Sequence, residues 1–205
     1  MTIAIIIITS AISILAFNNH NLFSKLQLNP YQTFHQKQWY RLLTHGFLHA
    51  DWLHLIINML VLYSFGTYIE DYFAHLKNAG YLNNPTLYYI FLYIGGVFIS
   101  SLTTLKKHKD DPYYNSVGAS GAVSAILFTS IFFAPWQKLL LYAVIPIPGI
   151  LLGVAYLVYS QYMSKKGKDN VNHDAHFIGA IYGFLFPIII DFRLVAHFIH
   201  SLTNF

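Results

Sequence analysis

Apolar residues along this chain are gathered into six long stretches separated by polar connections. In order, the stretches cover residues 1–17, 52–73, 86–105, 117–134, 138–163 and 174–200. A helix that spans a bilayer needs about 20 predominantly apolar residues, within a range of about 17–25, so the first stretch is marginal in length. The first stretch has no preceding Lys or Arg and no clear small-residue cleavage site, and we interpret it as an uncleaved first helix. The pattern predicts an all-α, polytopic bundle of six transmembrane helices.

Two regions depart from this simple alternation. Residues 18–51 mix Asn, Gln and His with apolar side chains, so we expect this loop to lie partly in the membrane interface. Pro135 is expected to end the fourth helix. Pro146, Pro148 and Gly149 are expected to interrupt the fifth helix, which a membrane tolerates where neighbouring groups or water satisfy the backbone.

The composition supports lipid as the solvent of this chain. Of its 205 residues, 56% are hydrophobic and 10% are charged, whereas a soluble domain carries about 25% charged residues. We therefore expect one membrane domain over residues 1–205, in a multi-pass protein of the cell membrane. The absence of Cys excludes a thiolate nucleophile and Cys-ligated zinc. The net charge of +4 is spread over the loops, which suits anionic lipid and gives no basic face for nucleic acid.

Basic residues are distributed unequally between the two sides that six spans define. Loops 1, 3 and 5 hold Lys25, Lys37, Arg41, Lys106, Lys107, Lys109, Lys165, Lys166 and Lys168. The opposite side holds Lys77, Lys138 and Arg193. By the positive-inside rule, this distribution places loops 1, 3 and 5 in the cytoplasm.

Polar side chains at the start of the second stretch form the first candidate cluster. His54 and Asn58 are four residues apart on an otherwise apolar helix, so both project from one face. His45 and His49 precede them, and we interpret those two as structural. Polar groups inside a span are costly and are functional candidates by default, although hydrogen bonding between helices is the alternative for all four.

A serine between glycines marks the start of the fourth stretch. Ser120 is flanked by Gly118 and Gly121, and small residues at this spacing also allow helices to pack closely. The start of a helix offers unsatisfied N–H groups and the positive end of the helix dipole. A nucleophile at Ser120 would therefore have donors ready for a developing oxyanion.

The sixth stretch begins with a histidine above two glycines. His176, Gly179 and Gly183 fall on one helical face, which leaves room for another helix to approach. If that partner is the helix of Gly118 and Gly121, Ser120 comes within reach of His176. We expect Ser120 to act as nucleophile and His176 as general base and acid. His54 and Asn58 would then stabilise the oxyanion.

Together these patterns resemble the rhomboid intramembrane serine proteases of the minimal six-helix form. The motifs run from about residue 39 to residue 183. They are Trp39 and Arg41 with His45, His49, His54 and Asn58; Gly66 with Glu70; the GASG sequence Gly118–Gly121; and Ala175, His176, Gly179 and Gly183. The resemblance implies a Ser–His dyad in a water-filled cavity, a first loop in one leaflet, single-span membrane proteins as substrates and no cofactor.

Two features depart from the family pattern. Relatives often carry an aromatic residue four positions after the nucleophile, stacked on the catalytic imidazole, and Ser124 stands there. Another group must then orient His176, and Asp174 is a poor candidate because residue i−2 lies on another face of the helix. Most relatives of this form also place loops 1, 3 and 5 away from the cytoplasm, opposite to the distribution of basic residues. We keep the family orientation.

Two other interpretations remain open. A catalytically inactive rhomboid-like protein would bind membrane clients without cutting them, but such proteins usually lack the serine or the histidine. A histidine-lined metal transporter or metalloenzyme would use His45, His49, His54, His173 and His176. Zinc proteolysis is disfavoured because no H-E-x-x-H sequence is present.

Overall fold

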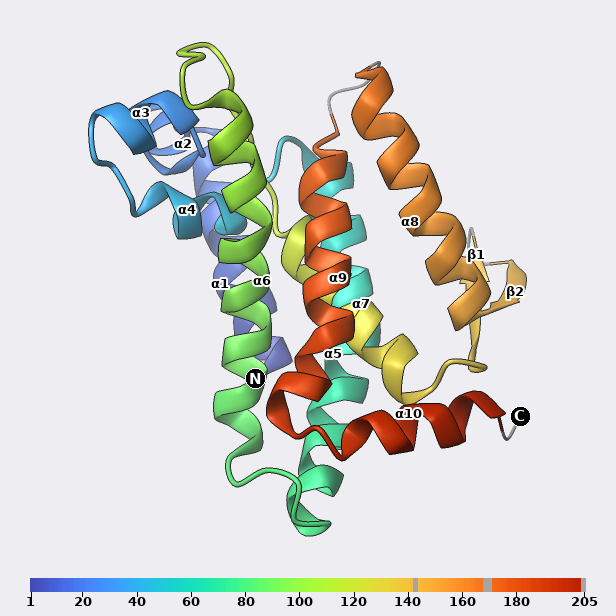
Figure 1. Ribbon diagram of the computed structural model, residues 1–205. Helices are drawn as coiled ribbons and strands as arrows, with labels where there is room; N and C mark the ends of the chain where they lie inside the picture. The colour runs from blue at the N-terminus through green and yellow to red at the C-terminus, as the bar shows by residue number, and fades with distance from the viewer. Residues whose placement is uncertain (142–143, 168–170, 204–205) are drawn as a thin grey trace.

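The computed structural model describes residues 1–141, 144–167 and 171–203, and these residues are mostly helical (Figure 1). In chain order the elements are α1 (Thr2–Phe17), α2 (His20–Leu26), α3 (Pro30–His35), α4 (Arg41–Thr44), the 3₁₀ turn η1 (His45–Phe47), α5 (Trp52–Asn78), α6 (Pro85–His108), α7 (Ser120–Phe133), β1 (Lys138–Leu141), β2 (Ile145–Pro148), α8 (Gly149–Lys166), α9 (His173–Ile190) and α10 (Leu194–Thr203). Among the described residues, α5, α6 and α9 are long and apolar enough to cross a membrane. The expected helical fold is confirmed, with three helices able to cross a membrane, and the count of six transmembrane helices stays a prediction.

Helix α7 forms the centre of the bundle. It packs against α5, α6 and α9, and most of its residues are buried. Figure 1 shows α8 standing beside α9, the short helices α2 to α4 at one end next to α6, and α10 crossing the other end of the bundle. The helix that begins with Ser120 is therefore surrounded by protein.

Polar side chains fix where the three long helices begin. Asp51 accepts a hydrogen bond from the backbone N–H of His54, and Asn84 and Asn172 cap α6 and α9 in the same way. Such caps satisfy one of the N–H groups that a helix start leaves without an internal partner. The position of His54 on the first turn of α5 thus follows from Asp51.

The loop before α5 is built around a buried arginine. The guanidinium of Arg41 donates from Nη1 to the carbonyls of Ser24 and Gln27, at 2.8 and 2.7 Å, and from Nε to the side chain of Gln38. These bonds join α2 and the turn before α4 into one compact unit. Residues 18–51 therefore have a defined structure that the sequence pattern alone did not predict.

The prediction of a fifth helix over 138–163 was wrong at its beginning. Strands β1 and β2 form an antiparallel hairpin, and α8 starts only at Gly149. Pro146 and Pro148 lack the N–H that a continuous helix would need, whereas an edge strand tolerates them. The N–H of Gly149 donates to Gln137 and that of Ile150 to Pro135, which anchors the start of α8. Residues 142–143 of this stretch and Lys168 of the fifth loop lie outside the described residues.

The expected sixth helix over 174–200 is also divided. Helix α9 ends at Ile190, and α10 begins at Leu194 with a different direction (Figure 1). Asp191 has an extended backbone, and its carboxylate accepts hydrogen bonds from the N–H and guanidinium of Arg193. This local pairing favours a turn over a continued helix. The fourth helix ends at Phe133, as Pro135 predicted. It starts at Ser120 and not at residue 117, and residues 115–119 are not helical.

Candidate active site

Glycines bring α7 and α9 into backbone contact. A Cβ atom built on Gly179 would overlap the carbonyl of Gly121, and one built on Gly183 would overlap the carbonyl of Ala125. Small residues at such positions let helix axes approach more closely than side chains otherwise permit. The face that carries His176 is therefore the face that meets α7.

The segment before Ser120 is held by the first loop. Ser116 pairs with Leu28 through two backbone hydrogen bonds of 3.0 and 2.9 Å, and the N–H of Gly118 donates to the carbonyl of His45. Gly118 has φ +128°, and a Cβ there would lie 2.9 Å from Cε1 of His54. Only glycine adopts this conformation readily in so little space. Ser120 is thereby presented on the first turn of α7.

A cleft of about 1160 Å³ lies between the helices and receives all four predicted reacting groups. Ser120, His176, His54 and Asn58 line it. Gly118 and Gly121 line it as well, while Gly179 and Gly183 lie deeper at the α7–α9 contact. Residues that are distant in sequence, on α5, α7 and α9, therefore share one cavity.

The ring of His54 is oriented by neighbours on its own segment. The backbone N–H of Ala50 donates to Nδ1 of His54 at 3.4 Å, so the matching tautomer carries its proton on Nε2. Nε2 faces Gly118, 3.1 Å from where a Cβ would stand at that position. His49 packs edge-on against this ring and is itself bonded through Nδ1 to Ser13 at 3.0 Å. His54 therefore offers an N–H to the cleft.

Asn58 is buried one turn below His54. Its Nδ2 donates to the carbonyl of His54 at 2.9 Å, which fixes the amide against its own helix. An amide nitrogen carries two hydrogens, so a second one is available to a group bound in the cleft. Asn58 and His54 thus present donors from the same face of α5.

His176 contacts an aromatic ring that the sequence analysis did not single out. The rings of Tyr156 and His176 are nearly parallel, with 17° between their planes and 6.3 Å between their centroids. The hydroxyl of Tyr156 lies 2.8 Å from that of Ser124. No sequence signal distinguishes Tyr156 from Tyr159 and Tyr162 on the same helix, because the contact depends on how α8 packs.

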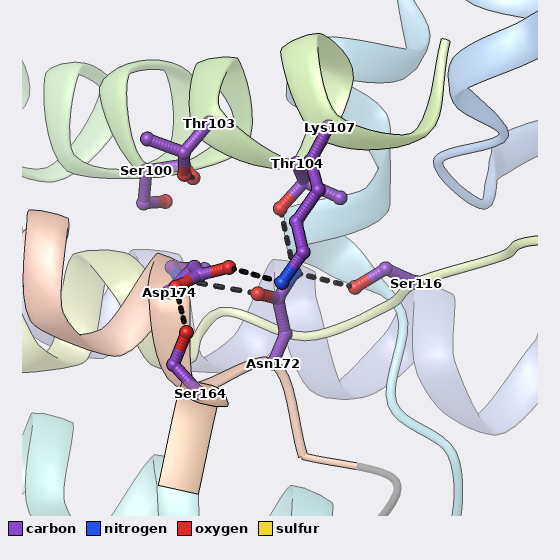
Figure 2. A network of polar contacts seen from close by, with 9 residues as sticks. Ser100, Thr103, Thr104, Lys107, Ser116, Ser164, Asn172 and Asp174 are labelled. Carbon is purple, nitrogen blue, oxygen red and sulfur yellow. Dashed lines mark hydrogen bonds and ion pairs between the residues drawn. The ribbon is translucent and has the colours of Figure 1, made fainter. Parts of the chain in front are cut away.

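A polar network lies at the rim of the cleft, and Figure 2 shows its contacts. Nζ of Lys107 lies 3.0 Å from the Asp174 carboxylate, which also accepts a hydrogen bond from Ser164. Asn172 donates from Nδ2 to Thr104 at 2.7 Å and to Ser116 at 3.3 Å. The network joins the ends of α6 and α8, the start of α9 and the segment before α7. Asp174 is thus engaged at the rim.

Two histidines of the first loop are held neutral. Burial lowers the pKa of His45 to about 4, and burial together with the neighbouring His54 lowers the pKa of His49 to about 3. Their environment disfavours the charged form because little water reaches it. At neutral pH, His45 therefore contributes packing and its backbone contact with Gly118, and His49 contributes packing and its side-chain bond to Ser13.

Within residues 1–141, 144–167 and 171–203, no group of three His, Asp or Glu side chains is arranged to hold a metal ion. The histidines named for a metal-binding function are instead divided among the first loop, α5 and α9.

Comparison with known proteins shows which family the chain resembles. The family model described as the Rhomboid domain matches residues 36–191. The chain is 33% identical over 152 residues to RHOMBOID-like protein 12, mitochondrial, of Arabidopsis thaliana, an alignment that covers 68% of this chain. It is 30% identical over 157 residues to Rhomboid-like protein 11, chloroplastic, of the same plant, covering 71% of this chain. These alignments span 43% and 50% of the two relatives.

Proposed function

The chain belongs to the rhomboid family, and we propose that it is a serine endopeptidase that cuts single-span membrane proteins in or near their transmembrane segment. The observation that carries the proposal is the shared cleft of Ser120 and His176. The two residues come from helices whose backbones touch through Gly179 and Gly121, so a hydroxyl and an imidazole face one cavity.

The reaction begins when His176 accepts the proton of Ser120 and the serine oxygen attacks the scissile carbonyl carbon. The carbonyl oxygen becomes an oxyanion, which accepts hydrogen bonds from His54 Nε2, from the Asn58 amide and from the backbone N–H of Ser120. His176 then gives its proton to the leaving amine, and an acyl-enzyme remains. Water attacks this ester with His176 as base, which releases the new carboxylate and restores Ser120.

The cleft has an apolar wall, which suits an apolar substrate, and a polar rim, which suits the water that hydrolysis requires. Leu53, Ile57 and Val61 on α5 face the cleft, while its rim carries the Lys107 and Asp174 network. A helical peptide bond is shielded by its own turn, so the substrate must be extended where it is cut. An apolar wall stabilises the unwound segment, and the polar rim admits the hydrolytic water.

We propose that the full domain has six spans, with α1, α7 and α8 crossing in addition to α5, α6 and α9. Helices α1 and α7 have 16 and 14 residues, which at 1.5 Å per residue gives lengths of about 24 and 21 Å. The non-helical residues 115–119 extend the crossing of α7, since irregular backbone is tolerated where it lines a cavity.

The proposed orientation places loops 1, 3 and 5 away from the cytoplasm in the cell membrane, as the family resemblance implies. The chain has no cysteine, so single cysteines at Lys106 and Lys77 report the two sides without background. In intact cells, an impermeant maleimide should label the first and spare the second. The reverse pattern contradicts this orientation, and fractionation distinguishes the cell membrane from an organelle membrane.

Purified protein in detergent with a model single-span substrate tests the activity. We expect cleavage that is lost in Ser120→Ala and in His176→Ala and that survives EDTA, with a fluorophosphonate probe labelling Ser120. The matched control is Ser130→Ala, which lies on the same helix and bonds within it. Stable substrate binding without cleavage or labelling would identify an inactive client-binding protein, and loss of cleavage with EDTA would favour a metal-dependent reaction.

A further inference from the structure

The ring of Tyr156 on α8 lies beside the imidazole of His176. Helix α8 contributes none of the proposed reacting groups. We propose that Tyr156 on α8 is a positioning residue for His176, and that Ser124 on α7 holds Tyr156 in place. The proposal rests on the function proposed above, because it assigns a role to the base of that reaction. It also explains what orients His176 in a chain with serine at position 124.

The ring geometry supports an oriented contact. A centroid separation of 6.3 Å with 17° between the planes falls within the offset-stacked range of about 4.5–7 Å. Rotation of the imidazole about its Cβ–Cγ bond would turn its nitrogens and drive its edge toward the phenol ring. A ring that lies alongside therefore restricts the rotation that would take a nitrogen away from Ser120.

Tyr156 is itself fixed by two residues of α7 one turn apart. Its hydroxyl lies 2.8 Å from the buried hydroxyl of Ser124, and its ring packs at 5.7 Å against that of Phe128. Both contacts must break before the phenol ring can move. Ser124 lies four residues after Ser120, on the same face of α7, so the nucleophile and the anchor of Tyr156 share one rigid helix.

Hydrogen bonds at both ends of α8 hold the helix that carries Tyr156. Its start is bonded to the carbonyls of Gln137 and Pro135, and its end is bonded to Asp174 through Ser164. Tyr156 lies between these two attachments. The orientation of the base thus depends on α8 staying docked against α7 and α9.

The test compares Tyr156→Leu, Tyr156→Phe and Ser124→Ala with the control Tyr162→Leu, whose ring is exposed on α8. Two readouts are used on the detergent-solubilised full chain. One is the ring carbon–proton NMR signal of His176, assigned by its loss in His176→Gln. The other is the division of any loss between kcat and KM for the model substrate.

We expect Tyr156→Leu to move the His176 signal and to lower kcat by about 2- to 13-fold with KM unchanged, the range that loss of one aromatic pair predicts. Tyr156→Phe keeps the ring but loses the same hydroxyl contact as Ser124→Ala, so both variants should retain more of kcat than Tyr156→Leu. Ser124→Ala should move the signal in the same direction as Tyr156→Leu, without a change of bulk. Tyr162→Leu should match the wild type in both readouts.

An unmoved His176 signal in both Tyr156→Leu and Ser124→Ala would overturn the proposal, whatever the activity. The NMR readout does not require turnover, so it decides the contact even if the wild type fails to cleave. Absence of Ser120-dependent cleavage would instead overturn the proposed function.

Discussion

Gly179 on α9 lies directly against the carbonyl of Gly121 on α7, leaving no room for a Cβ atom between the two backbones. This contact joins the helix of the proposed base to the helix of the proposed nucleophile. Because the obstructing atoms are backbone atoms, no side-chain rotation can relieve an added methyl group. The contact therefore sets how close Ser120 and His176 can come.

The first prediction concerns this contact. Gly179→Ala should destabilise the protein by about 3 kcal/mol or more, at the upper end of overpacking costs, because α7 and α9 must separate. Fluorophosphonate labelling of Ser120 should fall with it. Thermal unfolding in detergent measures the first effect. Gly149→Ala is the matched control, since a Cβ there meets only ordinary contacts at 3.4 to 3.5 Å. Wild-type stability in Gly179→Ala contradicts the backbone contact.

Asn58 is expected to matter for turnover and little for stability. Asn58→Ala removes a proposed oxyanion donor, so kcat should fall by about 10²–10³, as for other single donors. The lost hydrogen bond to His54 lies within one helix, so the unfolding temperature should change little. Ser64→Ala removes a similar bond within α5 at an exposed position and should leave kcat unchanged. Unaltered turnover in Asn58→Ala removes this residue from the oxyanion role.

The rim network is expected to hold the end of α8. In Asp174→Ala, Ser164 loses its partner, and a single cysteine at Met163 should react with maleimide about 1.5- to 5-fold faster, as loss of a partly exposed ionic contact predicts. Asp110→Ala is the control because its carboxylate bonds to His35 on the surface. Equal maleimide rates in the parent protein, Asp174→Ala and Asp110→Ala, each with the cysteine at Met163, would show that the network does not restrain α8.

Stability should decrease in acid because of His45 and His49. Burial depresses both pKa values in the folded protein, to about 4 and about 3, so the unfolded chain binds more protons below its own pKa near 6.5. The stabilisation is fully present above about pH 6.5 and is lost as the pH falls toward these values. Between pH 6.5 and pH 5, each of the two histidines should therefore lower the free energy of unfolding by roughly 2 kcal/mol, since one pKa unit corresponds to 1.36 kcal/mol. Unfolding temperatures from pH 7.5 to pH 5 measure the slope, which His45→Gln should reduce. A flat profile contradicts burial of neutral histidines.

Spacing along single helices was predictable because the helical repeat fixes it. His54 and Asn58 had to share a face of α5, and Gly179 and Gly183 had to lie below His176, whatever the rest of the chain did. The position of Ser120 near a helix start followed from its place at the beginning of the apolar stretch 117–134. The apolar stretches also predicted the long helices, although not the break at Asp191 or the hairpin before α8.

The tertiary structure alone decided which helices meet. The hairpin depends on local backbone pairing and the turn at Asp191 on hydrogen bonds to its carboxylate, and apolar periodicity reports neither. The contact between Tyr156 and His176 depends on where α8 packs, and α8 carries several tyrosines that its sequence leaves equivalent. Covalent geometry determines neighbours within one helix, whereas neighbours between helices are determined by the shapes that fit together.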